Sequence, residues 1–318
     1  MSDPQSTPDD SSESTPSELP ADQTGTGYLE RAQGALSALT ESRMAMLGLV
    51  ITFAMLILAL GAPIFAPNPP TPDGNWEGNL ENNFQPPFWE QGGTLEYPLG
   101  TDQQGRGILS RSLYGLRLAL IQGTVPVLIA GIIGVTLGLV SGFFGGWVDV
   151  VISRVVDTVM SIPLTLFAIA VIAVLGANLF NLVLVIGITQ WVPYTRTIRG
   201  QTLSIKNEEF IEAQRASGAS NSWILRHGIF PNTTSSILVI ATLNIAQVMV
   251  IAAGLTFLGL GVSPPRADLG LMLATGRNYL TTAWWYGFFP GLFLMLFVLG
   301  INLFGDGLRD ILDPKYLE

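Results

Sequence analysis

The sequence predicts an all-α fold, in the form of a polytopic membrane protein with six transmembrane helices. Of its 318 residues, 48% are hydrophobic and only 12% are charged, whereas soluble domains average about 25% charged residues. Several apolar runs also approach the length of about 20 residues that a helix needs to cross a lipid bilayer. A chain with so little charge and so many long apolar runs is expected to reside in a membrane.

The first two predicted spans are the longest. Residues 44–65 form an apolar run that ends at a proline-rich stretch, Pro67 to Pro70. Residues 118–144 form the second run, in which glycines recur at roughly helical spacing. Small residues let helices approach closely in lipid, so this second span is expected to pack inside the bundle.

The remaining spans are separated by residues that favour turns. The apolar stretch from 155 to 192 is too long for one span, and Gly176-Ala177-Asn178 divides it. Glycines and prolines between Gly259 and Pro265 prevent the fifth span from continuing. The last four predicted spans are 155–175, 179–192, 237–258 and 288–304.

The distribution of basic residues predicts which side of the membrane each loop faces. Positive charges concentrate in cytoplasmic loops. One set of loops contains Arg31, Arg43, Arg154, Arg196, Arg199, Lys206, Arg215, Arg226, Arg309 and Lys315, and the other contains Arg106, Arg111, Arg117, Arg266 and Arg277. The larger set includes both termini, which are therefore predicted to be cytoplasmic. Three arginines before the second span (Arg106, Arg111 and Arg117) could snorkel, pair with acids or lie on an interfacial helix.

A polar segment, residues 207–231, interrupts the apolar runs and is called the elbow below. Asn207 is expected to cap a first short helix and Gly218 to end it in a left-handed conformation. Ser220 or Asn221 would cap a second turn, and Pro231 would break the helix before the fifth span. Such a segment must face water. It either docks onto a soluble partner or forms an ordinary amphipathic connector on the membrane surface.

The elbow resembles the EAA loop of ABC-importer permeases, the loop that grips the ATP-hydrolysing subunit. The pattern is Glu-Ala-Ala, three residues, Gly, and a Pro thirteen positions later, and Glu212, Ala213, Gly218 and Pro231 match its spacing. The resemblance implies that these four residues and Arg215 couple the chain to an ATPase. The sequence departs from the family pattern at Gln214, Gly228 and Phe230.

Three further stretches narrow the resemblance to the second of the two permease types in dipeptide, oligopeptide and nickel importers. They are YPLGTDQQGRGILSRSLYGLRLAL (97–120), FLGLGVSPP (257–265) and NLFGDGLRDILDPK (302–315). Gly107 replaces an Asp that is common in the family. The resemblance runs from about Arg43 to the C-terminus and implies the type I ABC-importer permease fold.

The resemblance also implies a set of partners and a domain division. The partners are a second homologous permease subunit, two ATP-binding subunits and an extracytoplasmic substrate-binding protein. The chain itself would bind no cofactor, because ATP would bind the partner subunits. We expect a disordered acidic tail (1–27), an N-terminal region with the first span and an outer loop (28–112), the permease core (113–306) and a cytoplasmic C-terminal tail (307–318), in the plasma membrane.

Two polar residues lie within the fifth predicted span. Asn244 and Gln247 are three positions apart and share a helix face. Intramembrane polar groups either line a transport pathway or form hydrogen bonds between helices. A pathway role for both residues is therefore one of two open interpretations.

Other classes of function receive little support from the sequence. No phosphate-binding Gly-x-x-x-x-Gly-Lys-Ser/Thr loop is present, so no ATP hydrolysis is expected on this chain. The chain has no cysteine and one histidine, which argues against thiolate or multi-histidine metal sites. The net charge of −9 argues against nucleic acid as a partner. The remaining alternatives are a membrane scaffold or sensor, and a stand-alone secondary carrier.

Overall fold

The computed structural model describes residues 42–71 and 74–312, and all its helices and turns below belong to that part of the chain. The predicted acidic tail (1–27), Arg31, and residues 313–318 of the predicted C-terminal tail lie outside the described residues. Within them the chain is helical, and its one β-type contact is an isolated bridge between Thr101 and Gly107.

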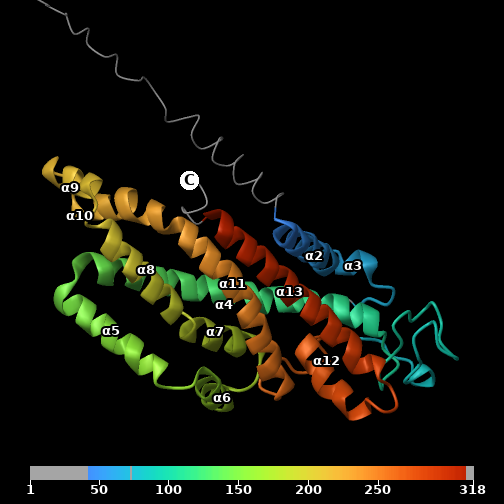
Figure 1. The fold of residues 1–318 in the computed structure, drawn as a ribbon. Helices are drawn as coiled ribbons and strands as arrows, with labels where there is room; N and C mark the ends of the chain where they lie inside the picture. The colour runs from blue at the N-terminus through green and yellow to red at the C-terminus, as the bar shows by residue number, and fades with distance from the viewer. Residues whose placement is uncertain (1–41, 72–73, 313–318) are drawn as a thin grey trace, which may run out of the picture.

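The helices follow one another with short connections through most of the chain (Figure 1). The described helices are α2 (Arg43–Leu60), α3 (Ala62–Phe65), η1 (Leu80–Asn82), α4 (Ile108–Phe144), α5 (Gly146–Met160), α6 (Leu164–Leu175), α7 (Leu179–Thr189), α8 (Val192–Ile205), α9 (Glu209–Ala216), α10 (Asn221–Trp223), η2 (Ile224–Ile229), α11 (Phe230–Phe257), α12 (Leu269–Gly276), η3 (Arg277–Tyr279) and α13 (Trp285–Leu312).

The described residues contain four helices that are long and apolar enough to cross a membrane, and a fifth span if the bent pair α5–α6 counts as one. The predicted count of six is therefore not confirmed. The fourth predicted span (179–192) corresponds to α7, which has only 11 residues, followed by α8 after a turn at Gln190 and Trp191.

The third predicted span is bent rather than continuous. α5 and α6 meet at an angle of 82°. Pro163 lies at the N-cap of α6 with φ −56° and ψ 122°. A proline has no backbone N–H and disfavours the helical conformation for the residue before it, so the helix stops at Met160 and restarts at Leu164.

The glycines of α4 bring that helix into close contact with α8, as expected for a span inside the bundle. A Cβ atom on Gly134 would lie 2.4 Å from the Trp191 carbonyl oxygen, and one on Gly142 would lie 2.6 Å from the Thr202 Cβ. These distances are too short for any side chain, so the backbones of the two helices approach each other directly. Small residues produce such contacts between membrane helices.

The connection between α3 and α4, described for residues 66–71 and 74–107 and called the 66–107 segment below, lies at the end of the molecule opposite α9 and α10 (Figure 1). Asp102 attaches this segment to α4: its side chain is fully buried and pairs with Arg106 and with Arg111 of α4. The contact between Arg106 Nη2 and Asp102 Oδ2 measures 2.7 Å. Of the three explanations left open for these arginines, pairing with an acid holds for Arg106 and Arg111, whereas Arg117 is exposed.

The last helix, α13, runs back from that end of the molecule toward the end that carries α9 (Figure 1). At its start, Trp285 donates its indole N–H to the Thr101 carbonyl oxygen at 3.1 Å. This bond joins the helix to the 66–107 segment. At its far end, α13 continues through position 307, the predicted start of the C-terminal tail, as far as Leu312.

Candidate functional site

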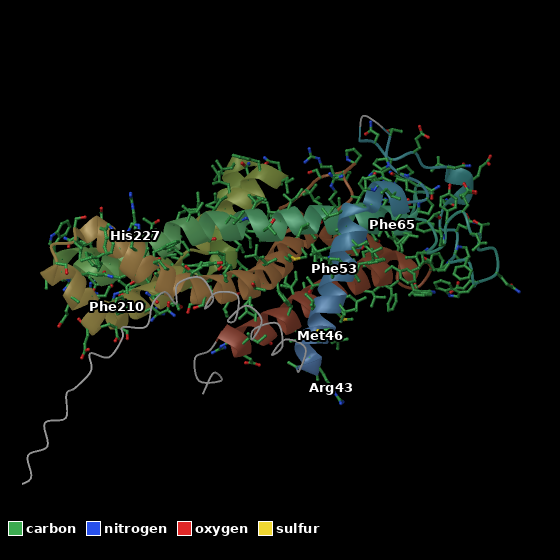
Figure 2. All side chains as sticks on the ribbon, turned by 90° about the horizontal axis from the view of Figure 1, so that it is seen from above. Arg43, Met46, Phe53, Phe65, Phe210 and His227 are labelled. Atoms are coloured by element: carbon green, nitrogen blue, oxygen red, sulfur yellow. The ribbon has the colours of Figure 1, made fainter. Side chains whose placement is uncertain are left out.

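The elbow projects from the end of the long helices and has a small hydrophobic core of its own. Figure 2 shows Phe210 and His227, both in the elbow, at the end of the molecule away from Phe65. Phe143 at the end of α4 packs with Ile211, Ile224 and Ile229, and all four side chains are buried. This core fixes α9 and the η2 segment against the end of α4, so the elbow is a packed unit.

The first helix of the elbow, α9, begins without a side-chain cap. Glu208 is the N-cap residue, in an extended conformation, and its side chain makes no capping bond. The predicted cap by Asn207 is wrong, because its amide nitrogen instead donates to the Leu203 carbonyl oxygen at 3.0 Å. Asn207 thus belongs to the end of α8. Glu209 and Glu212 in the first turn of α9 supply the negative charge that a helix N-terminus favours.

The end of α9 is a reversal that depends on Gly218. Its φ of +82° confirms the predicted left-handed conformation. The Ala219 N–H donates to the Gln214 carbonyl at 3.0 Å, and the Gly218 N–H donates to the Arg215 carbonyl at 2.9 Å. This pair of bonds is the Schellman motif, in which glycine has no Cβ penalty. The chain therefore turns sharply enough to lay α10 beside α9.

The second part of the elbow differs from the prediction at Pro231. Ser220 accepts a hydrogen bond from the Trp223 N–H at 3.4 Å, which confirms the predicted cap. Pro231, however, does not break the helix, since helical structure continues from Asn221 to Phe257. The residues before it form a π-helical segment, in which the Phe230 N–H donates to the Leu225 carbonyl five residues earlier. A widened turn accommodates the proline ring and its missing N–H.

Gly228 explains one of the departures from the family pattern. A Cβ atom at this position would lie 2.6 Å from Ile211 Cδ1 and 2.8 Å from Gln214 Oε1. Here α9 therefore crosses the π-helical segment so closely that no larger residue fits without displacing Ile211. Gly228 and Gln214, both departures from the pattern, are neighbours across this contact.

The predicted coupling residues lie on the surface of the elbow. Glu212, Ala213, Arg215, Gly218 and Pro231 are all exposed. An open groove of about 670 Å³ runs between α9 and α10. Its lining residues are Ala213, Gln214, Ser217, Gly218, Ala219, Ser220 and Trp223. Within the described residues, the structure thus brings Ala213 and Gly218 together in one groove.

The other predicted coupling residues lie outside that groove. The Arg215 guanidinium carbon is 5.8 Å from the centre of the Phe143 ring, so it rests on the elbow core. No ion pair joins Glu212 to another described residue. Pro231 lies at the start of α11. The arrangement offers a free carboxylate and an open groove to a partner.

Several bonds that the sequence does not predict join α8, the helix that leads into the elbow, to neighbouring helices. The Lys206 ammonium donates to the Gly142 carbonyl oxygen of α4 at 2.9 Å. Gln201 of α8 donates to the Ser236 hydroxyl of α11. Arg199 of α8 pairs with Asp149 of α5. The balance of basic residues between the two sides of the membrane carries no information about which acid each one meets.

The two polar residues predicted in the fifth span have different surroundings. Asn244 is 6% exposed, and its amide nitrogen has no hydrogen-bond partner among the described residues. Gln247 is exposed on the surface of α11. They therefore do not form a pair, and only Gln247 is accessible from outside this chain. No group of three or more potential metal ligands occurs in the part of the chain that the structure describes.

Comparison with known families identifies both parts of the chain. Residues 134–318 match the family model described as "Binding-protein-dependent transport system inner membrane component". Residues 31–87 match the "N-terminal TM domain of oligopeptide transport permease C". The first match covers more than half of the chain, and the two together cover both the elbow and the first span.

Curated relatives resemble the chain over most of its length. A dipeptide transport system permease protein, DppC, of Alkalihalophilus pseudofirmus is 40% identical over 88% of this chain and 89% of the relative. A di/tripeptide permease of Pseudomonas aeruginosa is 40% identical over 84% of this chain and 87% of the relative. The oligopeptide permease OppC of Bacillus subtilis is 36% identical over 88% of both chains.

A solved structure shows the same fold at lower identity. It is an inward-facing conformation of the MetNI methionine ABC transporter, with a TM-score of 0.52 and 20% identity. The match covers 63% of this chain and 96% of that chain. It supports the type I importer permease fold expected from the sequence.

Proposed function

The chain belongs to the family of binding-protein-dependent transport system inner membrane components, and we propose that it forms half of the translocation pathway of an ATP-driven peptide importer. The three relatives described above carry the names of peptide permeases. No phosphate-binding loop is present in the sequence. The energy for transport therefore comes from separate ATP-binding subunits, through the elbow.

The observation that carries this proposal is the combination of a packed core and an open groove in one protruding unit. Phe143, Ile211, Ile224 and Ile229 hold the elbow rigidly on the end of α4. Ala213, Gly218 and Trp223 line the groove on its surface. A rigid projection transmits force, whereas a flexible connector would absorb it. The ATP-binding subunit would seat against α9 and the groove, with Glu212 and Arg215 at its edge.

The bonds at the base of the elbow suggest how movement reaches the spans. Lys206 ties the end of α8 to α4, and Arg199 ties α8 to α5. When closure of the ATP-binding subunits moves the elbow, α8 and α5 would move with it. This movement of α5 would shift the bend between α5 and α6, and the bend would then open or close the pathway. Gln247, exposed on α11, would face the pathway, while Asn244 would support α11 from inside.

The proposal includes the partners and the orientation. A second homologous permease would complete the pathway, two ATP-binding subunits would bind the two elbows, and an extracytoplasmic binding protein would deliver the cargo. The elbow and both termini would be cytoplasmic in the plasma membrane, as the distribution of basic residues indicates. The 66–107 segment, at the opposite end, would face the binding protein.

A matched pair of variants tests the coupling role. Ala213 and Ala216 are both exposed on α9, but only Ala213 lines the groove. In the intact complex, Ala213→Trp should fill the groove and abolish peptide uptake while ATP hydrolysis continues. Ala216→Trp, which adds the same bulk outside the groove, should leave uptake close to the wild-type rate.

The same preparation distinguishes the two other classes of function. Purification of the wild-type complex should yield co-eluting ATP-binding subunits, and uptake into vesicles should require ATP. A membrane scaffold or sensor need not bring ATPases with it. A stand-alone secondary carrier would support uptake by the chain alone without ATP. Equal uptake by the two tryptophan variants would contradict coupling through the groove.

A further inference from the structure

A second cavity lies away from the elbow, where the α5–α6 bend meets the junction between α7 and α8. Its volume is about 450 Å³, within the range of about 300–1,000 Å³ that is typical of small-molecule sites. Met160, Pro163 and Phe167 form one wall, and Ile188, Gln190 and Pro193 form the other. The walls are mostly apolar, so the cavity suits an apolar group.

One polar side chain in these walls lacks a partner. Gln190 is 5% exposed, and its amide nitrogen makes no hydrogen bond to any described residue. The neighbouring Thr189 hydroxyl is satisfied within its own helix, by the Val185 carbonyl at 2.8 Å. A buried amide without a partner is costly. Gln190 therefore has an unused donor, which a rotation of its side chain would bring to an occupant.

A charged side chain contacts one residue of the cavity wall. The Arg196 guanidinium contacts the sulfur of Met160 at 3.2 Å, and Arg196 forms no ion pair with a described residue. Asp157 and Arg154 are exposed on the same side, on α5. Asp157 and Arg196 also line a smaller adjoining cavity of about 170 Å³. Charged groups are not stable against lipid tails, so this flank of the bundle faces water or a polar surface.

We propose that the cavity is a cargo subsite for a short peptide with an apolar side chain, an inference that rests on the proposed function. The apolar side chain enters the cavity between Phe167 and Ile188. A rotation of the Gln190 side chain brings its amide nitrogen to a backbone carbonyl of the peptide, to which it donates. The Arg196 guanidinium, beside Met160 of the wall, pairs with the free C-terminal carboxylate. The three contacts together match the chemistry of an unblocked peptide.

The location of the cavity supports this assignment over a purely structural void. Both of its walls end at breaks in helices, the α5–α6 bend and the α7–α8 turn. A void between two breaks changes shape when α5 and α8 move. Because Arg199 fastens those two helices together, elbow movement would alter the same site that holds the cargo.

The test uses the intact importer in proteoliposomes and compares uptake of Leu-Leu with uptake of Gly-Gly. Ile188→Trp fills the cavity, and Val174→Trp is the control, since Val174 is 84% exposed and does not line it. A pocket that accepts an apolar group discriminates by about tenfold or more. Ile188→Trp should lower Leu-Leu uptake by about that factor and leave Gly-Gly uptake within about twofold. Val174→Trp should change neither.

The two polar contacts are tested in the same assay. Arg196→Gln should reduce the preference for free peptides over C-terminally amidated ones, whereas Arg154→Gln should not. Gln190→Leu should slow uptake of both dipeptides. The binding protein is identical in every sample, so a change in the ratio of the two peptides' uptake rates must arise in the permease.

Several outcomes would overturn the inference. An equal loss of Leu-Leu and Gly-Gly uptake in Ile188→Trp would mean that the cavity does not select the cargo. Loss of the second permease from purified Ile188→Trp complex would mean that a partner helix fills the cavity. If the wild-type complex imported no peptide at all, the proposed function would fail first, and the subsite with it.

Discussion

The Arg199 guanidinium donates two parallel hydrogen bonds to the Asp149 carboxylate, from Nε at 2.5 Å and from Nη2 at 2.6 Å. These bonds join α8 to α5. The Ser141 hydroxyl at the end of α4 donates to the same carboxylate at 2.5 Å. One carboxylate thus joins three helices close to the elbow. The pair therefore couples the helix that leads into the elbow to α5, which carries the bend at its far end.

Loss of this ion pair should weaken both stability and coupling. We expect Arg199→Gln and Asp149→Asn each to lower stability by about 1 kcal/mol, because both side chains are partly exposed and solvent screens the pair. The double variant should lose little more than either single variant, since the same interaction is removed. Thermal unfolding of the purified complex measures these values, and fully additive losses would show that the two residues act independently.

Gly134 on α4 should tolerate no side chain. A Cβ there would lie 2.4 Å from the Trp191 carbonyl, whereas a Cβ on Gly131, one turn earlier, has its nearest neighbour at 3.8 Å. Gly134→Ala should therefore cost about 1–3 kcal/mol through overpacking. Gly131→Ala should be nearly neutral. The melting temperatures of the two variants check this, and equal values would contradict the close approach of α4 and α8.

Gly218 should be sensitive to backbone conformation alone. Its φ is +82°, and a Cβ there would meet nothing within 4 Å. Gly218→Ala should cost about 1–2 kcal/mol in the turn, because the left-handed region is unfavourable for alanine. Gly218→Asn should cost less, since asparagine tolerates this region. Amide hydrogen exchange in α9 should accelerate in the alanine variant and recover toward wild type in the asparagine variant. Identical exchange in the two would show that side-chain contact, not backbone strain, decides the effect.

Asp102 should be the most sensitive acid of the 66–107 segment. It is buried between Arg106 and Arg111, so Asp102→Asn leaves two buried guanidinium groups without a counter-charge. Breaking a buried pair in this way costs about 3–5 kcal/mol. Limited proteolysis should then cut within 74–101, whereas the wild type should resist cleavage there. Glu81→Gln, a change at an exposed acid, should keep that resistance.

The sequence was most informative where one residue has few structural options. The left-handed turn at Gly218 and the cap at Ser220 follow from local backbone chemistry, and both are found in the structure. The all-helical fold and the permease family also follow from the apolar runs and the motifs. Ala213 and Gly218, which the motif predicts as coupling residues, both line the groove, and their coupling role stays a prediction.

The sequence was least informative where a distant contact decides the outcome. Pro231 does not break its helix, because a π-helical turn before it absorbs the ring. Asn207 does not cap α9, because it bonds back to α8. The pairing of Asp149 with Arg199 links positions 50 residues apart and leaves no local signal. Each of these three features depends on how helices pack against one another, which the local sequence does not reveal.

The position of the elbow relative to the membrane and to an ATPase tests the central claim most directly. The natural chain has no cysteine, so Ala213→Cys introduces a single reactive thiol into the groove of this subunit. A membrane-impermeant maleimide should modify this position in inverted vesicles stripped of the ATP-binding subunits and not in intact cells, and rebinding of the ATP-binding subunits should protect it. Modification from outside intact cells, or labelling that the ATP-binding subunit does not affect, would contradict a cytoplasmic coupling elbow.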